Sequence, residues 1–278
     1  GGQGVTLDVA GNNLISVQVN PALVDQLIEN RGLIAAPDGR VIMTLSSERR
    51  LMDGAIASNV QQAQAIVDAG DGVTSRIVAG GKIESGTIAI AGGATGRVEA
   101  TGAISSQNLS GAGGQIAITG GDVFVGSGAL VDASGSTGGG VVDIGGGFQG
   151  ASPDLLNART TTVDAGASIK ADALTAGNGG NVVIWSDKNT QFAGNISARG
   201  GANNGDGGSV EVSGKQLLDF TGSVDLRAVA GKTGTLLLDP NNITIQSSGS
   251  DTGVTGTDAS ASGSILTVST IRNLLDTS

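Results

Sequence analysis

Residues Gly177–Phe220 read GNGGNVVIWSDKNTQFAGNISARGGANNGDGGSVEVSGKQLLDF and contain one structural unit almost twice. Each copy has a pair of glycines, an alternating apolar strand, a polar corner, a phenylalanine and a further short strand. The apolar positions recur at a constant step of 28 residues, as Val182 and Val210, Ile184 and Val212, Phe192 and Phe220, Ile196 and Val224. A constant step with glycine corners is typical of a solenoid, in which each coil stacks on the one before.

The same unit extends along the chain in both directions. Its first inward residues form one column with steps of 47, 28, 26, 40, 28 and 26 residues: Val41, Ile88, Ile116, Val142, Val182, Val210 and Leu236. Two further columns run through Ile104, Val131, Ile169, Ile196 and Val224, and through Val125, Val163, Phe192 and Phe220. Three columns predict three strands in each coil. The two long steps predict insertions, one between Val41 and Ile88 and one at Phe148–Thr160.

These patterns predict an all-β parallel β-helix with coils of about 26–28 residues. Alternation turns one side chain inward and the next outward, and each strand bonds to its equivalent in the neighbouring coils. Glycine, at 49 of 278 residues, disfavours long helices and suits tight corners, and it shows no collagen period. The apolar content of 38% argues against disorder.

Outside the clear repeats, local signals predict some helix. Asn20–Gly32 reads as a short helix, because Asn20 can cap it, Pro21 suits its first position and Gly32 can end it. Strands are expected at residues 1–19, 33–36 and 40–45, and a helical turn near Glu48–Met52 within the poorly repetitive segment 46–70. We divide the chain into the end of a β-helix that carries a helical or irregular insertion (1–75), a repetitive β-helix (76–246) and a linker with the start of a further segment (247–278), including a helix at 269–278.

Charge and composition exclude several functions. The net charge of −10 and the absence of a Lys/Arg stripe argue against nucleic-acid binding, which needs clustered cations. Cysteine is absent, so neither disulfides nor thiolate sites can form. No apolar run approaches the ~18 residues of a membrane helix. Because the first residues read as strand from within a domain, we expect targeting signals to lie outside this sequence.

The sequence offers no set of catalytic residues. Without histidine or cysteine, His-dependent bases, catalytic triads and ordinary zinc sites are excluded. Asp143 and Glu211 share an outward column with Val183 between them, at the spacing of an inverting glycosidase, but we expect solvated surface charge. Gly205–Val212 is similar to a calcium-binding turn, yet turn formation by Asn204 and Asp206 explains it better. We therefore predict no enzyme, no cofactor and no metal.

Trp185 is the only tryptophan, and alternation places it with Val183 on the outer face. One explanation is that it packs against the insertion at 148–160. The other is a surface-binding platform for sugars, because indole faces stack on pyranose rings. Asn108, Asn195 and Asn242 stand in Asn-x-Ser/Thr sequences, which are acceptor patterns for glycosylation.

Five stretches give the chain a resemblance to the filamentous-haemagglutinin family, the exoproteins of bacterial two-partner secretion. They are Ile28–Thr44 (IENRGLIAAPDGRVIMT), Val131–Gly146 (VDASGSTGGGVVDIGG), Gly177–Asp187 (GNGGNVVIWSD), Ile196–Lys215 (ISARGGANNGDGGSVEVSGK) and Gly234–Ile245 (GTLLLDPNNITI). The resemblance implies a right-handed parallel β-helix, and residues 1–70 are similar to the end of the family's secretion domain. It also implies export through an outer-membrane transporter, which would act on the upstream part missing here. Some members of the family are glycosylated at asparagines.

The expected function is therefore the shaft of a secreted adhesin on the bacterial surface. Carbohydrate or a host-surface receptor is the expected partner, and self-association is a further expectation. One alternative is a purely structural module of an extracellular filament or biofilm matrix. Another is the stalk of an exoprotein that delivers a toxin.

Overall fold

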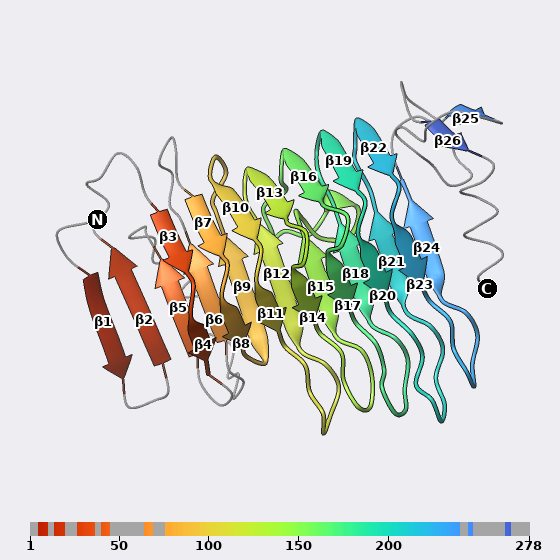
Figure 1. Cartoon of the computed structure of the whole chain (residues 1–278), viewed down its shortest axis with the longest axis horizontal. Helices are drawn as coiled ribbons and strands as arrows, with labels where there is room; N and C mark the ends of the chain where they lie inside the picture. The colour runs from red at the N-terminus through yellow and green to blue at the C-terminus, as the bar shows by residue number, and fades with distance from the viewer. Residues whose placement is uncertain are drawn as a thin grey trace.

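The chain forms a parallel β-helix in a computed structural model that describes residues 5–10, 14–19, 27–36, 40–44, 64–68, 76–239, 244–246 and 265–267. In these residues the backbone winds through three long sheets that lie around a common interior (Figure 1). We call them sheets A, B and C in the order in which each coil visits them. The predicted fold class is confirmed.

From Arg76 to Leu238, every coil adds one short strand to each sheet. Sheet A has ten strands in the described residues: β1 (Val5–Ala10), β2 (Leu14–Val19), β5 (Arg40–Thr44), β6 (Gln64–Asp68), β9 (Thr87–Ala91), β12 (Gln115–Thr119), β15 (Val141–Ile144), β18 (Asn181–Ile184), β21 (Ser209–Val212) and β24 (Thr235–Leu238). Sheet B has seven: β3 (Leu27–Asn30), β7 (Arg76–Ala79), β10 (Arg97–Ala100), β13 (Asp122–Val125), β16 (Thr160–Val163), β19 (Asn189–Phe192) and β22 (Leu217–Phe220). Sheet C also has seven: β4 (Leu33–Ala35), β8 (Lys82–Glu84), β11 (Ala103–Ser105), β14 (Leu130–Asp132), β17 (Ser168–Lys170), β20 (Asn195–Ser197) and β23 (Ser223–Asp225). A separate parallel pair joins β25 (Thr244–Gln246) to β26 (Ile265–Thr267).

The strand register reproduces the three predicted columns. In sheet A, Val142 pairs with Val182, Val182 with Val210 and Val210 with Leu236. The column of Ile104 runs along sheet C, and the column of Val125 runs along sheet B. The step of 40 residues is therefore one coil that carries an insertion.

The interior is mostly apolar and is filled by these columns. Ile116, Ile144 and Val182 are at most 1% exposed. The rings of Phe192 and Phe220 stack on consecutive coils with centroids 5.3 Å apart. Stacked identical positions let each side chain pack on its own kind, which keeps the interior close-packed from coil to coil.

The hydroxyl groups of two buried threonines donate hydrogen bonds to backbone carbonyls at the corner between sheets A and B. The Thr161 hydroxyl donates to the Trp185 carbonyl (2.6 Å), and the Thr190 hydroxyl donates to the Ser213 carbonyl (2.7 Å). Each carbonyl belongs to the next coil. Because an unpaired buried carbonyl is costly, these hydroxyls explain why a polar residue stands in a column that is otherwise apolar.

The turn from sheet C to sheet A forms a thin stack of loops, which project downward in Figure 1. Gly208 N donates to Ala198 O across its own coil (2.7 Å), while Ser209 N donates to Gly180 O of the preceding coil (3.0 Å). A Cβ on Gly208 would lie 2.1 Å from Gly180 O. The close approach of successive backbones therefore requires glycine here, which is the physical reason for the recurring Gly-Gly pairs.

The first part of the chain differs from several predictions. Leu27–Asn30, predicted as helix, is strand β3 paired in parallel with β7, so the sheet overrides the local helix signals. The 47-residue step is not one coil with an insertion in sheet A, because Ala65 of β6 lies between Val41 and Ile88 in the ladder. Sheets B and C nevertheless pass directly from β3 to β7 and from β4 to β8. β1 and β2 are strands as expected, but they pair antiparallel.

Other sequence-based expectations fall partly or wholly outside the described residues. The helical turn at Glu48–Met52 and the helix at 269–278 lie there, as do residues 20–26 of the first predicted helix. Ile265–Thr267, which the sequence assigned to no element, is a strand. The three-segment division of the chain stays a prediction.

A Val210→Asp substitution is expected to destabilise the protein by more than about 3 kcal/mol, because it buries a carboxylate without a partner. Ser209→Asp, one residue away on the exposed outer face, is the matched control and should change stability by less than about 0.5 kcal/mol. Urea denaturation followed by circular dichroism measures both. Equal effects would contradict the inward assignment of Val210.

A Gly208→Ala substitution is expected to lower the free energy of unfolding by about 1–3 kcal/mol, because its Cβ would collide with the preceding coil. Gly138→Ala is the control, since the nearest atom to that Cβ is 3.7 Å away. It should be neutral or slightly stabilising. A Gly208→Ala protein as stable as the control would show that backbone approach does not require the glycine.

Candidate functional site

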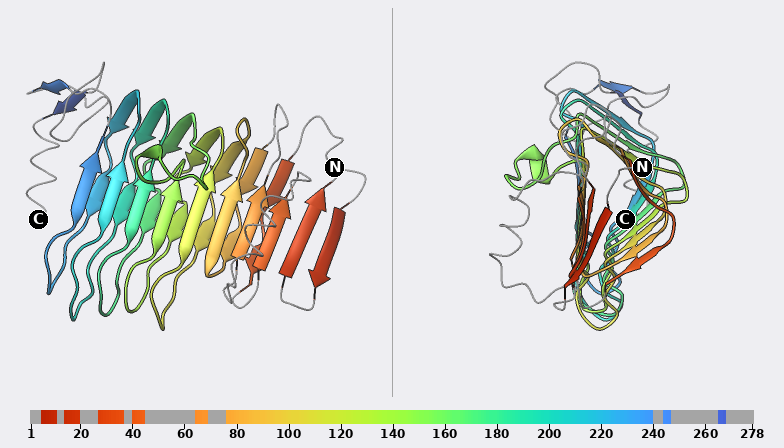
Figure 2. Two further views of the ribbon diagram at one scale, coloured as in Figure 1. Left: turned by 180° about the vertical axis from the view of Figure 1, so that it is seen from behind. Right: turned by 90° about the vertical axis from the view of Figure 1, so that its left-hand side faces the viewer.

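The most distinctive local feature is the insertion between β15 and β16. Residues 146–157, which we call the strap, leave the corner after β15 and fold over the outside of sheet A (Figure 2, right). They contain one short 3-10 turn, Phe148–Gly150, in which Gln149 has a positive φ of 53°. Thr160, which the sequence placed in the insertion, already belongs to β16.

The strap lies directly against Trp185. A Cβ on Gly150, whose φ is +61°, would lie 2.5 Å from the indole atom Cε2. Trp185 is consequently only 6% exposed, and its Nε1 donates to Asp187 Oδ1 (3.2 Å). Asn157 Nδ2 donates to the same Oδ1 (3.1 Å) and to Gly150 O (2.9 Å). Asp187 thus joins the indole to the end of the strap.

The strap also reaches one coil further, to Glu211. Gln149 N donates to Glu211 Oε2 (2.9 Å), and the Ser213 hydroxyl donates to Oε1 (2.7 Å). Glu211 is 1% exposed although it points to the outer face of sheet A. A single side chain therefore ties the strap, which leaves β15, to β21 two strands away.

Two carboxylates on the outer face of sheet A have altered acidities. Burial, together with the negative charge of Glu211, raises the pKa of Asp143 to about 6. Burial also raises the pKa of Glu211, partly offset by the hydrogen bonds from Gln149 and Ser213, while Asp239 adds repulsion. Val183, 7% exposed, separates the two in the ladder.

The structure places the predicted site residues in this cluster. Trp185 and Val183 are on the outer face, as alternation required; the strap covers Trp185, and Val183 is buried as well. This is the arrangement of the packing explanation, and the indole offers no open platform for a sugar. The expectation that Glu211 is solvated surface charge is wrong, because the strap folds over it. Sequence periodicity located this insertion in the chain, but it gave no sign that the insertion would cover Glu211.

The three candidate glycosylation residues have different settings. Asn108 is exposed in the turn after β11, and its Oδ1 accepts from Ser110 N (3.0 Å) and Gly111 N (2.9 Å). Asn195 is exposed in β20, and its Oδ1 accepts from the Ser223 hydroxyl (2.7 Å). Asn242 lies outside the described residues. Both described asparagines already serve local hydrogen bonding.

Asn204 and Asp206 link coils through the turns. Asn204 Oδ1 accepts from Gly177 N (2.9 Å), and Asp206 Oδ1 accepts from Lys232 N (2.8 Å). Within the described part of the chain, no group of three or more His, Cys, Asp or Glu residues could hold a metal ion. The same residues contain no helix with the length and apolarity to cross a bilayer.

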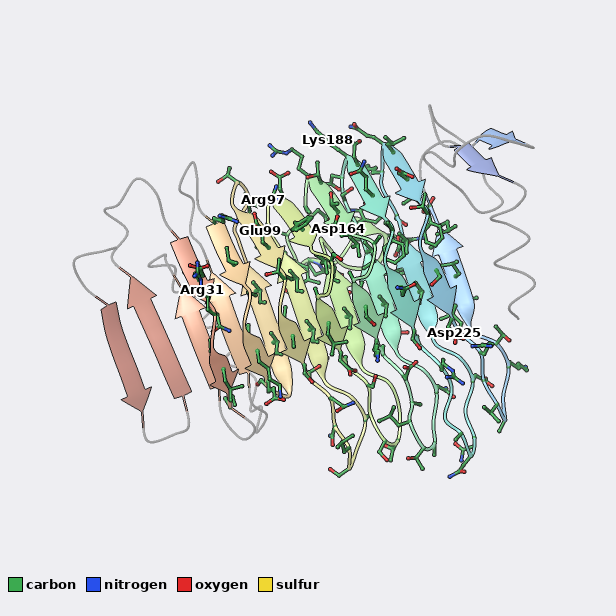
Figure 3. All side chains as sticks on the ribbon, viewed as in Figure 1. Arg31, Arg97, Glu99, Asp164, Lys188 and Asp225 are labelled. Carbon is green, nitrogen blue, oxygen red and sulfur yellow. The ribbon has the colours of Figure 1, made fainter. Side chains whose placement is uncertain are left out.

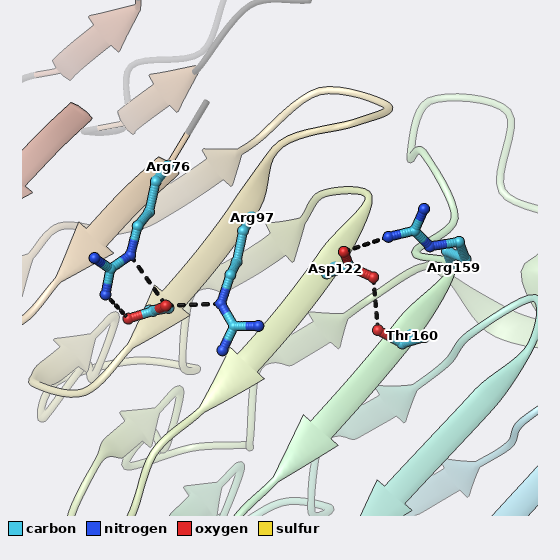
Figure 4. A network of polar contacts seen from close by, with 6 residues as sticks. Arg76, Arg97, Asp122, Arg159 and Thr160 are labelled. Carbon is cyan, nitrogen blue, oxygen red and sulfur yellow. Dashed lines mark hydrogen bonds and ion pairs between the residues drawn. The ribbon is translucent and has the colours of Figure 1, made fainter. Parts of the chain in front are cut away.

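Charged side chains elsewhere are spread over the outside of the coils (Figure 3). On sheet B, Glu99 accepts from Arg76 and from Arg97 Nε (2.7 Å), and Asp122 accepts from Arg159 and Thr160 (Figure 4). The Arg76 guanidinium lowers the pKa of Glu99. Such exposed pairs contribute about 0–1 kcal/mol each, so they adjust the surface and do not hold the fold.

Comparison with known proteins gives limited information. No family model and no curated protein matches the chain. Among solved structures, the chain is similar to the crystal structure of the HMW1 secretion domain from Haemophilus influenzae, with 25% sequence identity and a TM-score of 0.49. The match covers 77% of this chain and 49% of that one. The chain thus spans about half the length of that structure.

Trp185 is expected to show blue-shifted fluorescence that acrylamide quenches poorly, because the strap covers the indole. Gly150→Ala should increase the quenching, since the new methyl group would displace the indole or the strap. Pro153→Ala, at an exposed strap position, is the control and should leave the quenching unchanged. Red-shifted emission that moves when glycans are added would instead support the sugar platform.

Proposed function

We propose that this chain is the shaft of a secreted bacterial adhesin exported by two-partner secretion. The observation that carries the proposal is the unbroken inward column from Ile88 to Leu236, which makes β9–β24 one continuous solenoid. Three of the five stretches that resemble filamentous haemagglutinins lie within these coils. Residues 131–146 include most of β14 and all of β15, residues 177–187 include β18, and residues 196–215 include most of β20 and all of β21.

A solenoid of this kind is suited to an adhesive role because it presents loops at fixed intervals along its length. The thin edge between sheets C and A carries three exposed apolar side chains, Leu109 (72%), Leu174 (43%) and Val229 (73%). They lie in the turns after β11, β17 and β23. Exposed apolar groups held on stacked loops favour contact with a host or matrix surface, in which several weak contacts act together.

Export supplies the second part of the proposal. An outer-membrane transporter would export the protein, and the β-helix would then fold outside the cell as a surface structure. The proposal includes no enzymatic activity. Asp143 and Glu211 share an outward column at glycosidase spacing, but the closed strap covers Glu211, which argues against access by a sugar chain.

The binding proposal is tested with the purified, fluorescently labelled chain on surfaces coated with mucin or collagen and on cultured epithelial cells. We expect saturable binding to at least one of them. Replacing Leu109, Leu174 and Val229 by serine should weaken this binding at least threefold, because it removes the apolar contacts without disturbing the core. Leu33→Ser, an equally exposed change on sheet C, is the matched control and should bind normally.

A folded chain that binds none of these surfaces would contradict the adhesin proposal. Assembly of the same chain into filaments, detected by sedimentation, would then favour the structural module of an extracellular matrix. Turnover of a polysaccharide, if lost in Glu211→Gln, would overturn the non-enzymatic part.

A further inference from the structure

We propose that the strap is a clasp that fastens three successive coils of sheet A, and that it closes more tightly in acid than at neutral pH. The proposal concerns residues 146–157 and the outer face beneath them, and it does not depend on the adhesin function. The proposal is argued from the contacts of the strap and from the outward column of sheet A that contains Glu211.

The clasp spans strands that are far apart in the sequence. The strap leaves β15, packs its Gly150 backbone on Trp185 after β18, and donates Gln149 N to Glu211 on β21. Both partners come from coils that follow the strap in the chain. The clasp can therefore close only after β18 and β21 have been added, so it fastens coils that are already stacked.

The outward column of sheet A that contains Glu211 carries like charges at neutral pH, and these charges repel one another. Asp143, Val183 and Glu211 occupy equivalent positions on β15, β18 and β21. Asp143 faces the negative charge of Glu211, and Glu211 in turn faces Asp239. The strap itself contributes Asp154, which is exposed. The nearby Arg159 pairs with Asp122 on sheet B, and Asp187 accepts from Trp185 and Asn157.

The direction of the pH effect follows from the acidities. The strap covers Glu211, and burial raises the pKa of that carboxyl. The pKa of Asp143, two strands away, is raised to about 6 by burial and by the charge of Glu211, so the closed state holds protons that the open state releases. Stabilisation of the closed clasp is fully present below the ordinary pKa of Asp143, near 4, and is lost as the pH rises through 6. Opening at neutral pH uncovers Trp185.

The test measures how often the clasp opens. Hydrogen exchange of the Gln149 amide, corrected for the intrinsic rate at each pH, reports opening because that N–H is bonded to Glu211. We expect its protection factor to fall about tenfold between pH 5.0 and 7.5, the ratio given by a shift of about two units in the pKa of Asp143. The Phe192 amide in sheet B serves as a reference for global unfolding.

Asp143→Asn removes the titrating group with little change of shape. In this variant the protection of Gln149 at pH 7.5 should rise toward the value at pH 5.0, and the pH dependence should flatten. Asp154→Asn removes one charge from the exposed part of the strap and is the matched control, so it should keep the wild-type pH dependence. Glu211→Ala should lower the protection at both pH values, because the acceptor of Gln149 N is lost.

Equal protection of Gln149 at the two pH values in the wild-type protein would overturn the proposal without any variant. The same holds if the Phe192 amide loses protection in parallel with Gln149, because the pH effect would then belong to the whole coil. If Asp154→Asn flattens the pH dependence as Asp143→Asn does, the effect comes from the net charge of the protein and not from the carboxylates on the outer face of sheet A.

Discussion

The structure depends on the hydrogen bonds that each coil makes to the next, which set successive backbones about 4.8 Å apart. At that spacing each side chain packs first against the equivalent side chains of the neighbouring coils, so the shapes of these side chains must match. Isoleucine and valine satisfy this requirement inside the sheets, and Phe192 on Phe220 satisfies it at one larger site. Where the chain doubles back between sheets C and A, a Cβ at Gly208 finds no room at all. One constraint thus explains both the apolar columns and the glycine content.

The same constraint determines where polar groups are buried. At the corner between sheets A and B, the Trp185 carbonyl lies just past the end of β18 and accepts a hydrogen bond from the Thr161 hydroxyl of the preceding coil. On the outer face, Glu211 accepts from Gln149 N of a segment that leaves the solenoid. Both cases join one coil to another through a side chain. The strap is therefore an additional connection between coils, and its buried carboxylates make it sensitive to pH.

Much of the β-helix could be predicted from the sequence, because stacking repeats the same residues at the same positions. The register of Val142, Val182 and Val210 followed from counting alone. Prediction failed where repetition was weak: β3 carries the local signals of a helix, and β6 presents only Ala65 to the column. The contact between the insertion and Trp185 was one of two explanations that the sequence offered for an apolar residue on an outward face. The contacts of Gln149 and Asn157 were out of reach because they join non-repeating residues.

Double electron–electron resonance between spin labels at Thr87 and Thr235 most directly measures whether the coils stack without interruption past the strap. These two residues are outward-facing, and five strand-to-strand steps separate them in sheet A. The account predicts one narrow distance distribution centred near 24 Å, which is five times the strand spacing. A broad distribution, or a centre beyond about 35 Å, would contradict it.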